Sequence, residues 1–216
     1  MTHPLPSWGP PLPPSPASPE DLEESTTVCF RKIYSGELQI SDVIDMMKDF
    51  STYEPGHIKH DFCQRMIQNL FDECRYFPRY PPEELALTGE LLGSLIRHEL
   101  VSSSNQWLAW RCVLEALKRP MRTKMFRFGI RALEQFLTKL PSCPLLCHHL
   151  TTIEHLTISF PTYVEYASGI LRALPEELRH TMTIASDMLA AYEMPPAPEL
   201  VEHSQDDSPP TQPPPP

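Results

Sequence analysis

The fold is decided by the stretch FCQRMIQNLFDECRYFPRYPPEEL (residues 62–85), together with VLEALKRPMRTKMFRFGIRALEQF (residues 113–136). Apolar residues in the first stretch recur at i, i+4, i+5 and i+8, as they do on one face of an α-helix. Glycine is nearly absent from both stretches, and prolines stand where one helix would stop and the next begin. The pattern predicts a succession of amphipathic helices.

The same pattern continues on both sides of these stretches. We expect helices at about residues 19–34, 41–50, 57–77, 83–100, 105–118, 122–140 and 145–158, a further one from residue 161, and a last one at 175–192. Ser41 is a suitable N-cap for the second helix. Helices of this length with short turns and no strand pattern predict an all-α fold, a HEAT-like stack of antiparallel helix pairs.

Proline is concentrated at the two ends of the 216-residue chain. Eight of its 26 prolines lie in residues 1–19 and nine in residues 195–216. Such segments cannot bury enough apolar surface to offset the entropy lost on ordering. We therefore expect a disordered Pro-rich tail at residues 1–18, one helical-repeat domain at residues 19–193, and a disordered acidic Pro-rich tail at residues 194–216.

The formal net charge of −10 argues against a surface that binds nucleic acids in general. No apolar run is long enough to predict a membrane-spanning helix. The N-terminus lacks the basic and apolar regions of a secretory signal peptide. We therefore expect a cytoplasmic protein, with the nucleus as an additional location, no membrane partner, and six cysteines present as free thiols.

Residue patterns suited to catalysis or metal binding are missing. Cys143, Cys147, His148 and His149 are zinc-ligand types, but they form one cluster without a second ligand pair. The adjacent Cys147 and His148 would point about 100° apart on a helix. No nucleophile motif, glycine-rich phosphate loop or paired carboxylate set occurs. We expect no enzyme activity, no cofactor and no metal site.

Basic residues gather between positions 111 and 131, where Glu115 is the one acidic residue. The cluster consists of Arg111, Lys118, Arg119, Arg122, Lys124, Arg127 and Arg131. Three interpretations stay open: a solvated helix face, a contact for an acidic peptide, and an RNA contact. The RNA interpretation is the weakest, because no exposed aromatic residues are interleaved with the basic ones.

Three phrases resemble one protein family in their order and spacing: NLFDECRYFPRYP at residues 69–81, VLEALKRP at 113–120 and FGIRAL at 128–133. They are similar to a segment of Not1, the scaffold and largest subunit of the CCR4–NOT deadenylase complex. The resemblance covers about residues 28–167 and implies a helical-repeat domain that binds the C-terminal helix of tristetraprolin. Cys74 stands where the family pattern has an aromatic residue, and residues 102–109 diverge from it.

The first three expected helices carry more methionine and aromatic residues than three helices usually bury among themselves. Such residues at the open end of a stack are typical of an adaptable groove for an amphipathic helix. The alternative is that all of them are core. Because the resemblance favours the groove, we expect these partner-binding residues: Phe30, Ile33, Tyr34, Met46, Met47, Phe50, Phe62, Met66 and Asn69.

Pattern and resemblance together indicate a non-catalytic protein-interaction module in post-transcriptional repression or deadenylation. It would bind short helical motifs of mRNA-decay adaptors such as tristetraprolin, with CCR4–NOT components as further partners and no direct nucleic-acid contact. The alternative is a helical structural subunit docked permanently on a larger assembly.

Overall fold

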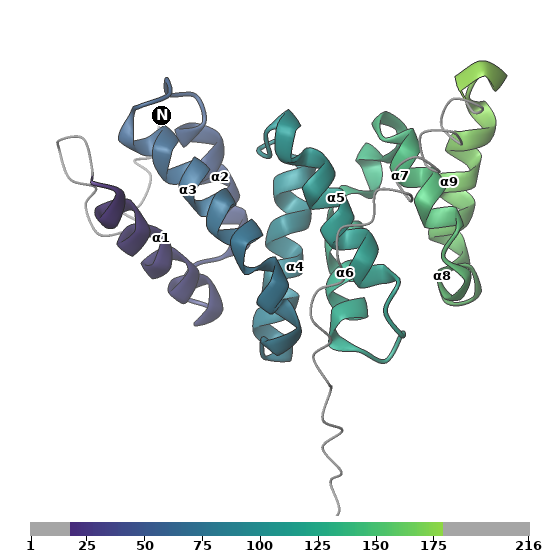
Figure 1. Ribbon diagram of the computed structural model, residues 1–216, viewed down its shortest axis with the longest axis horizontal. Coiled ribbons are helices and arrows are strands. Elements are labelled where there is room, and N and C mark those ends of the chain that lie inside the picture. The colour runs from purple at the N-terminus through teal and green to yellow at the C-terminus, as the bar shows by residue number, and fades with distance from the viewer. Residues whose placement is uncertain (1–17, 179–216) are drawn as a thin grey trace, which may run out of the picture.

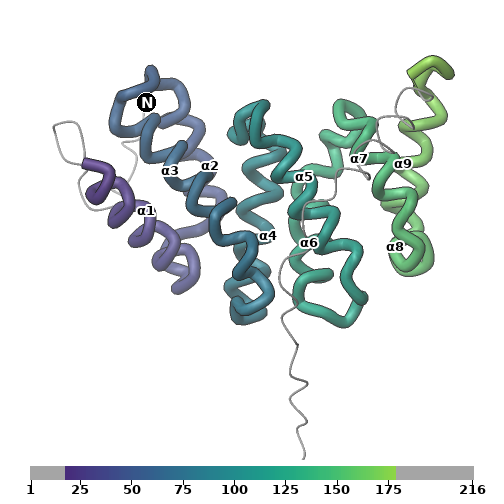
Figure 2. The backbone as a smooth tube through the Cα atoms, in the orientation of Figure 1, coloured from purple at the N-terminus to yellow at the C-terminus, as the bar shows by residue number. Residues whose placement is uncertain are grey.

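The computed structural model describes residues 18–178, and within that range it consists of helices and the turns between them, with no strand (Figure 1). The helices are α1 (Pro19–Tyr34), α2 (Ile40–Phe50), α3 (Ile58–Glu73), η1 (Cys74–Arg79), α4 (Pro82–Arg97), α5 (Ser103–Leu117), α6 (Lys124–Phe136), η2 (Leu137–Ser142), α7 (Pro144–Thr151), α8 (Glu154–Ser159) and α9 (Pro161–Ala173). They stand side by side in one row, from α1 at one end to α9 at the other (Figures 1 and 2). The all-α helical stack predicted from the sequence is confirmed.

The start of α1 agrees with the expected boundary, whereas the start of α2 does not. Ser18 caps α1 in a reciprocal capping box: its hydroxyl accepts from the Asp21 amide at 3.2 Å, and the Asp21 carboxylate accepts from the Ser18 amide at 3.0 Å. Ser41 was the predicted cap of the second helix, but α2 already begins at Ile40, after Gln39, which makes no side-chain cap bond. Ser41 is therefore the second residue of the helix.

Proline sets the ends of α3 and α6. Each expected helix was too long, because the last turn is a 3₁₀-helix that contains a proline: Pro78 in η1 and Pro141 in η2. A proline lacks an amide donor and its ring clashes with the carbonyl four residues earlier, so the α-helical hydrogen bonds stop just before that position. Accordingly α3 ends at Glu73 and α6 ends at Phe136.

Two other expected helices are also shorter in the structure. The helix expected at 83–100 ends at Arg97, and Glu99 follows with a positive φ of 58°. The helix expected at 145–158 is divided into α7 and α8 around Ile153, whose side chain is buried. Of the last expected helix, 175–192, the part beyond residue 178 lies outside the described residues, as do nearly all of both Pro-rich tails.

The middle of the row is held by the contact of α4 with α6, the most extensive between any two helices of the described chain. Gly89 and Gly93 give α4 a face without side chains. A Cβ atom added at Gly89 would lie 2.8 Å from the carbonyl oxygen of Phe128, and one at Gly93 would overlap the backbone of Ala132. The two helices approach closely because these positions are glycine.

One continuous core runs under all the helices. Its largest fully buried side chains include Phe77, Phe128, Phe136, Met47 and Met66. At the N-terminal end of the row, α1 and α3 run parallel. Arg65 Nε of α3 lies 3.8 Å from the Glu23 carboxylate of α1, and one turn later Asn69 Nδ2 donates to Thr26 Oγ1 at 2.9 Å. Within residues 18–178, no helix combines the length and the hydropathy needed to cross a membrane.

Candidate partner-binding site

Four of the nine predicted partner-binding residues belong to the core. Ile33, Met47, Phe62 and Met66 have exposed fractions of 1%, 0%, 5% and 1%. The apolar stripes of α1, α2 and α3 bury these side chains against one another and against α4. The expectation that Met47, Phe62 and Met66 line an open pocket is therefore wrong, because these side chains support the stack from inside.

The other five predicted residues are half-buried, and they lie in two places. Phe50 packs edge-on against Phe62 near the start of α3, with Lys59 Nζ 5.0 Å from its ring centre. Met46 lies one helical turn before Phe50 on α2. Phe30 and Tyr34 lie instead at the C-terminal end of α1, where their rings stack at 6.2 Å. The structure thus does not gather the nine residues into one groove.

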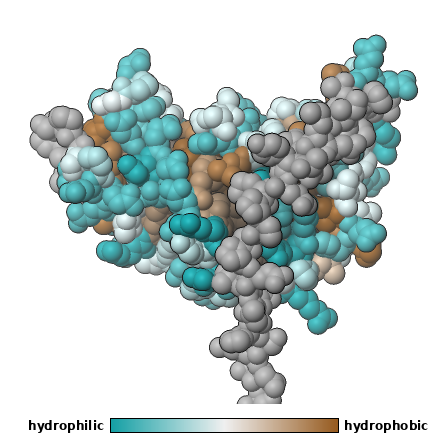
Figure 3. Space-filling model, in the orientation of Figure 1, coloured by the Kyte–Doolittle hydropathy of each residue, from teal (hydrophilic) through white to brown (hydrophobic). Residues whose placement is uncertain are grey.

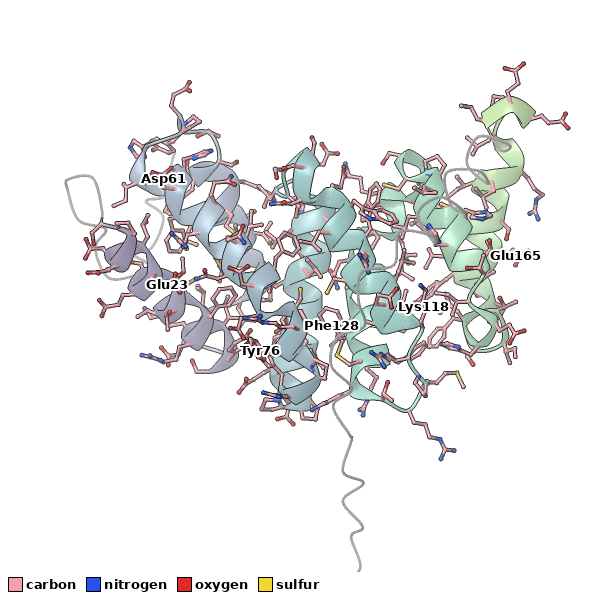
Figure 4. All side chains as sticks on the ribbon, in the orientation of Figure 1. Glu23, Asp61, Tyr76, Lys118, Phe128 and Glu165 are labelled. Carbon is pink, nitrogen blue, oxygen red and sulfur yellow. The ribbon has the colours of Figure 1, made fainter. Side chains whose placement is uncertain are left out.

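Asn69 belongs with the α1 residues. Its side-chain amide donates to Thr26 Oγ1 at 2.9 Å and to the Glu23 carboxylate at 3.1 Å. These bonds join α3 to α1 and hold the helix that carries Phe30 and Tyr34. Figure 4 labels Glu23 on α1 and Tyr76 on η1, in the same part of the row.

A cluster of aromatic rings forms where α1 meets η1. We call it the tyrosine cluster, and it consists of Phe30, Tyr34 and Tyr80 with the carboxylate of Glu73. The Tyr34 and Tyr80 rings meet edge to face, 6.2 Å between centres. The Tyr80 hydroxyl donates to Glu73 Oε2 at 3.1 Å. All three rings are half-buried and Glu73 is exposed, so the cluster offers aromatic surface beside a negative charge.

Each tyrosine is fixed by its own contacts. Phe77 is fully buried against Phe128, 5.2 Å between ring centres, and it packs edge-on against Tyr80. Thr88 lies within hydrogen-bond distance of the Tyr34 hydroxyl, at 3.1 Å. Because the Thr88 hydroxyl already donates to the Glu84 carbonyl at 2.7 Å, Tyr34 is the donor in that bond.

The electrostatic surroundings of the cluster keep both tyrosines neutral. Burial raises the pKa of Tyr80, and Tyr34 and the Glu73 carboxylate raise it further. Burial also raises the pKa of Tyr34, with Glu84 and Glu73 acting in the same direction. Neutral rings with a negative rim attract a cation, both through the carboxylates and over the ring faces.

Sequence reasoning missed Tyr80 and Glu73 as site residues. Both lie inside the phrase NLFDECRYFPRYP that carried the family resemblance, so the resemblance contained the signal. Their contact with Tyr34 could not be read from the sequence, because η1 turns the chain back toward α1 only in the folded protein.

The basic cluster is divided by the fold. Lys118 pairs with Glu115 at 2.9 Å, and Lys124 Nζ donates to the backbone carbonyl oxygen of Tyr80 at 2.8 Å. Arg127 and Arg131 border a hollow of about 450 Å³ with an apolar lining of Ala86, Met121, Phe126, Ile130 and Phe160. Figure 3 shows that one face of the row is mostly hydrophilic, with separate hydrophobic patches between the hydrophilic areas.

The four zinc-ligand types do not form a metal cage. Cys143 and Cys147 are buried, and Cys147 Sγ donates to the carbonyl oxygen of Leu140 at 3.3 Å. His149 faces Trp107, with 5.9 Å between ring centres. In the described part of the chain, no three His, Cys, Asp or Glu side chains come together as metal ligands.

Two similar proteins are much longer than this chain. General negative regulator of transcription subunit 1 of Schizosaccharomyces pombe is 38% identical over 142 residues, which are 65% of this chain and 7% of that protein. CCR4-NOT transcription complex subunit let-711 of Caenorhabditis elegans is 31% identical over 172 residues, 75% of this chain and 6% of that protein. The chain therefore spans only a small part of the length of these relatives.

A solved structure and a family model agree with these relatives. The N-terminal domain of the yeast Not1 superposes with a TM-score of 0.65 at 26% identity, over 71% of this chain and 29% of that one. The model of the CCR4-NOT transcription complex subunit 1 TTP binding domain matches residues 12–173, most of the chain. The protein described here is therefore a member of the CCR4-NOT transcription complex subunit 1 TTP binding domain family.

Proposed function

We propose that this chain is a non-catalytic interaction module that binds a short amphipathic helix of an mRNA-decay adaptor of the tristetraprolin kind. The contact surface is the tyrosine cluster. One observation carries the proposal: Phe30, Tyr34 and Tyr80 remain half-buried beside the exposed Glu73 carboxylate, inside the region that matches the family. The name of that family supports the class of partner.

The chemistry of the cluster specifies the partner further. Aromatic residues supply large contact area at low entropic cost and are frequent anchors of helix-in-groove complexes. Glu73 and Glu84 act on both tyrosines, and the chain carries a net charge of −10. The partner helix should therefore present an apolar face to Phe30 and Tyr34, with an Arg or Lys toward Glu73.

In this role the module links an adaptor to deadenylation without performing chemistry. Capture of an adaptor would support mRNA decay if the chain also contacts CCR4–NOT components, and it would oppose decay if the chain only competes for the adaptor. A permanent structural subunit is the alternative. That role requires an obligate partner, so the isolated chain would aggregate on purification, whereas an exchanging module stays monomeric.

The test is a titration of a fluorescent peptide, the C-terminal helix of tristetraprolin, against the full chain and two variants. Phe30→Ala removes an anchor and Glu73→Lys reverses the charge at the rim. Each should weaken binding about 30-fold or more, equivalent to about 2 kcal/mol.

Matched controls come from the same chain. Phe50→Ala removes a half-buried aromatic that lies outside the cluster, and Glu165→Lys reverses a charge on α9, at the far end of the row (Figure 4). Both should change affinity less than about threefold. Circular dichroism must show each variant folded. No binding to the unaltered chain would refute the adaptor assignment, and equal loss in cluster and control variants would place the contact elsewhere.

A further inference from the structure

Two of the six cysteines differ from the rest. All six lie in the described residues, and four of them (Cys29, Cys63, Cys143 and Cys147) are buried. Cys74, the first residue of η1, and Cys112, on α5, are only half-buried. Their sulfur atoms lie 3.3 Å apart, although 38 positions separate them in the sequence.

The surroundings of this pair, within residues 18–178, do not form a metal site. Cys74 Sγ has one further partner, the carbonyl oxygen of Leu70 at 3.4 Å. No third metal-ligating side chain joins the two thiols in the described chain. The hydrogen bond to Cys112, together with burial, raises the pKa of Cys74, so Cys74 keeps its proton at neutral pH.

We infer that Cys74 and Cys112 form an oxidation site, at which a hydroperoxide converts the two thiols into a disulfide that joins η1 to α5. The first step is attack of the Cys112 thiolate on a peroxide oxygen. The O–O bond breaks, Cys112 becomes a sulfenic acid, and hydroxide (or alkoxide) leaves and takes up the thiol proton. In the second step Cys74 Sγ attacks Cys112 Sγ: the S–S bond forms, the S–O bond breaks, and the Cys74 proton leaves with the oxygen as water. Two thiols are oxidised by two electrons and one hydroperoxide is reduced.

The geometry makes this reaction selective. A disulfide requires sulfur atoms about 2.0 Å apart, so the pair must approach by about 1.3 Å from its present separation. Rotation of the two side chains, with any local backbone adjustment, must supply this approach. The buried cysteines are shielded from the oxidant by the core, whereas Cys74 and Cys112 are partly open to solvent.

The disulfide would have a mechanical consequence. It would link η1, which precedes Tyr80, covalently to α5, a helix that lies further along the row. Closing a loop of this length restricts the unfolded chain, and the oxidised protein should therefore melt on the order of 10 °C higher than the reduced one. This inference does not depend on the proposed function.

The experiment treats the folded full chain with hydrogen peroxide, blocks remaining thiols with iodoacetamide, and digests it with trypsin without reduction. Mass spectrometry should find peptide 66–75 joined to peptide 112–118 with the loss of two hydrogen atoms. The cross-link should be lost after reduction with dithiothreitol, and the melting temperature should return to its lower value.

Controls separate the site from general thiol oxidation. Cys112→Ser should prevent both the cross-link and the rise in melting temperature, and Cys143→Ser should leave both intact. Oxidation in urea should yield mixed cross-links, because selectivity requires the fold. Sulfinic acid at Cys112 without a cross-link, or a dominant link between other cysteines in the folded unaltered chain, would overturn the inference without reference to any variant.

Discussion

Lys124 of α6 donates through Nζ to the backbone carbonyl oxygen of Tyr80, 2.8 Å away. This bond connects the middle of the stack to the tyrosine cluster, so Lys124 is not merely part of a solvated basic face, which was one of the three interpretations of the basic cluster. Arg127 and Arg131, on the same helix, border the hollow instead. Lys124 of the basic cluster therefore has a structural role.

This bond predicts that Lys124→Met weakens peptide binding through Tyr80. Loss of the charged donor leaves the Tyr80 carbonyl unpaired and loosens the turn before α4, at a cost of about 1–2 kcal/mol in unfolding free energy. Peptide affinity should fall about 3- to 10-fold, as measured in the same fluorescence titration. Arg127→Met is the control. An equal loss of peptide affinity in both variants would show that the positive charge, and not the hydrogen bond to Tyr80, determines the affinity.

Two glycines in different surroundings, one in the contact of α4 with α6 and one in α9, predict opposite effects for Gly→Ala substitutions. Gly93→Ala places a methyl group in the backbone of Ala132 and should destabilise the protein by at least about 2 kcal/mol. At Gly169 in α9, an added Cβ atom would meet only a side-chain nitrogen of Arg172, at 3.9 Å. Gly169→Ala should therefore stabilise the protein by about 0.5–1 kcal/mol, because alanine loses less backbone entropy on folding. Urea unfolding measures both. Similar destabilisation by both would contradict the close approach of α4 and α6.

The capping box predicts that Ser18→Ala destabilises α1. The substitution removes the acceptor of the Asp21 amide and should cost about 1 kcal/mol. Loss of amide protection in hydrogen exchange should be confined to the first turns of α1. Ser41→Ala is the control, since Ser41 does not cap α2 and its loss should change stability by less than about 0.5 kcal/mol.

His149 predicts a loss of stability in acid. Burial, with His148 and Lys118 nearby, lowers the pKa of His149, and its Nε2 atom is buried without a hydrogen-bond partner in the described structure. The unfolded chain then binds more protons between the lowered pKa and about 6.5, so unfolding free energy rises with pH across that interval and falls on acidification. His149→Phe keeps a ring against Trp107 and should flatten this dependence. An unchanged slope of urea midpoint against pH would assign the effect to other groups.

The helices could be predicted because their determinants are local. Apolar spacing defines the buried face of each helix, and a proline acts on a carbonyl only four residues away. The close approach of α4 and α6 at Gly89 and Gly93, in contrast, depends on two helices that are distant in the sequence. The errors before Pro78 and Pro141 are each of about one turn, and they concern the kind of helix and not its existence.

The candidate site could be predicted only in part, because exposure is not a local property. Met46 and Met47 are adjacent on α2, yet Met46 is half-buried and Met47 has no exposed surface. Phe30 and Tyr34 were expected in a groove with Met66, but Met66 fills the core and the two aromatic residues meet Tyr80 instead. No periodicity distinguishes these outcomes, since each side chain fits an apolar stripe.

The sequence by itself therefore determined the helical stack and the family, because helix formation and characteristic phrases depend on neighbouring residues. The tertiary structure alone decided which apolar residues remain accessible, which cysteines touch and which lysine supports Tyr80. Those relationships join α1 to η1, η1 to α5 and α6 to the turn before α4. They arise from the packing of helices that are distant in sequence, and the distance between two such side chains is fixed only when the whole row is assembled.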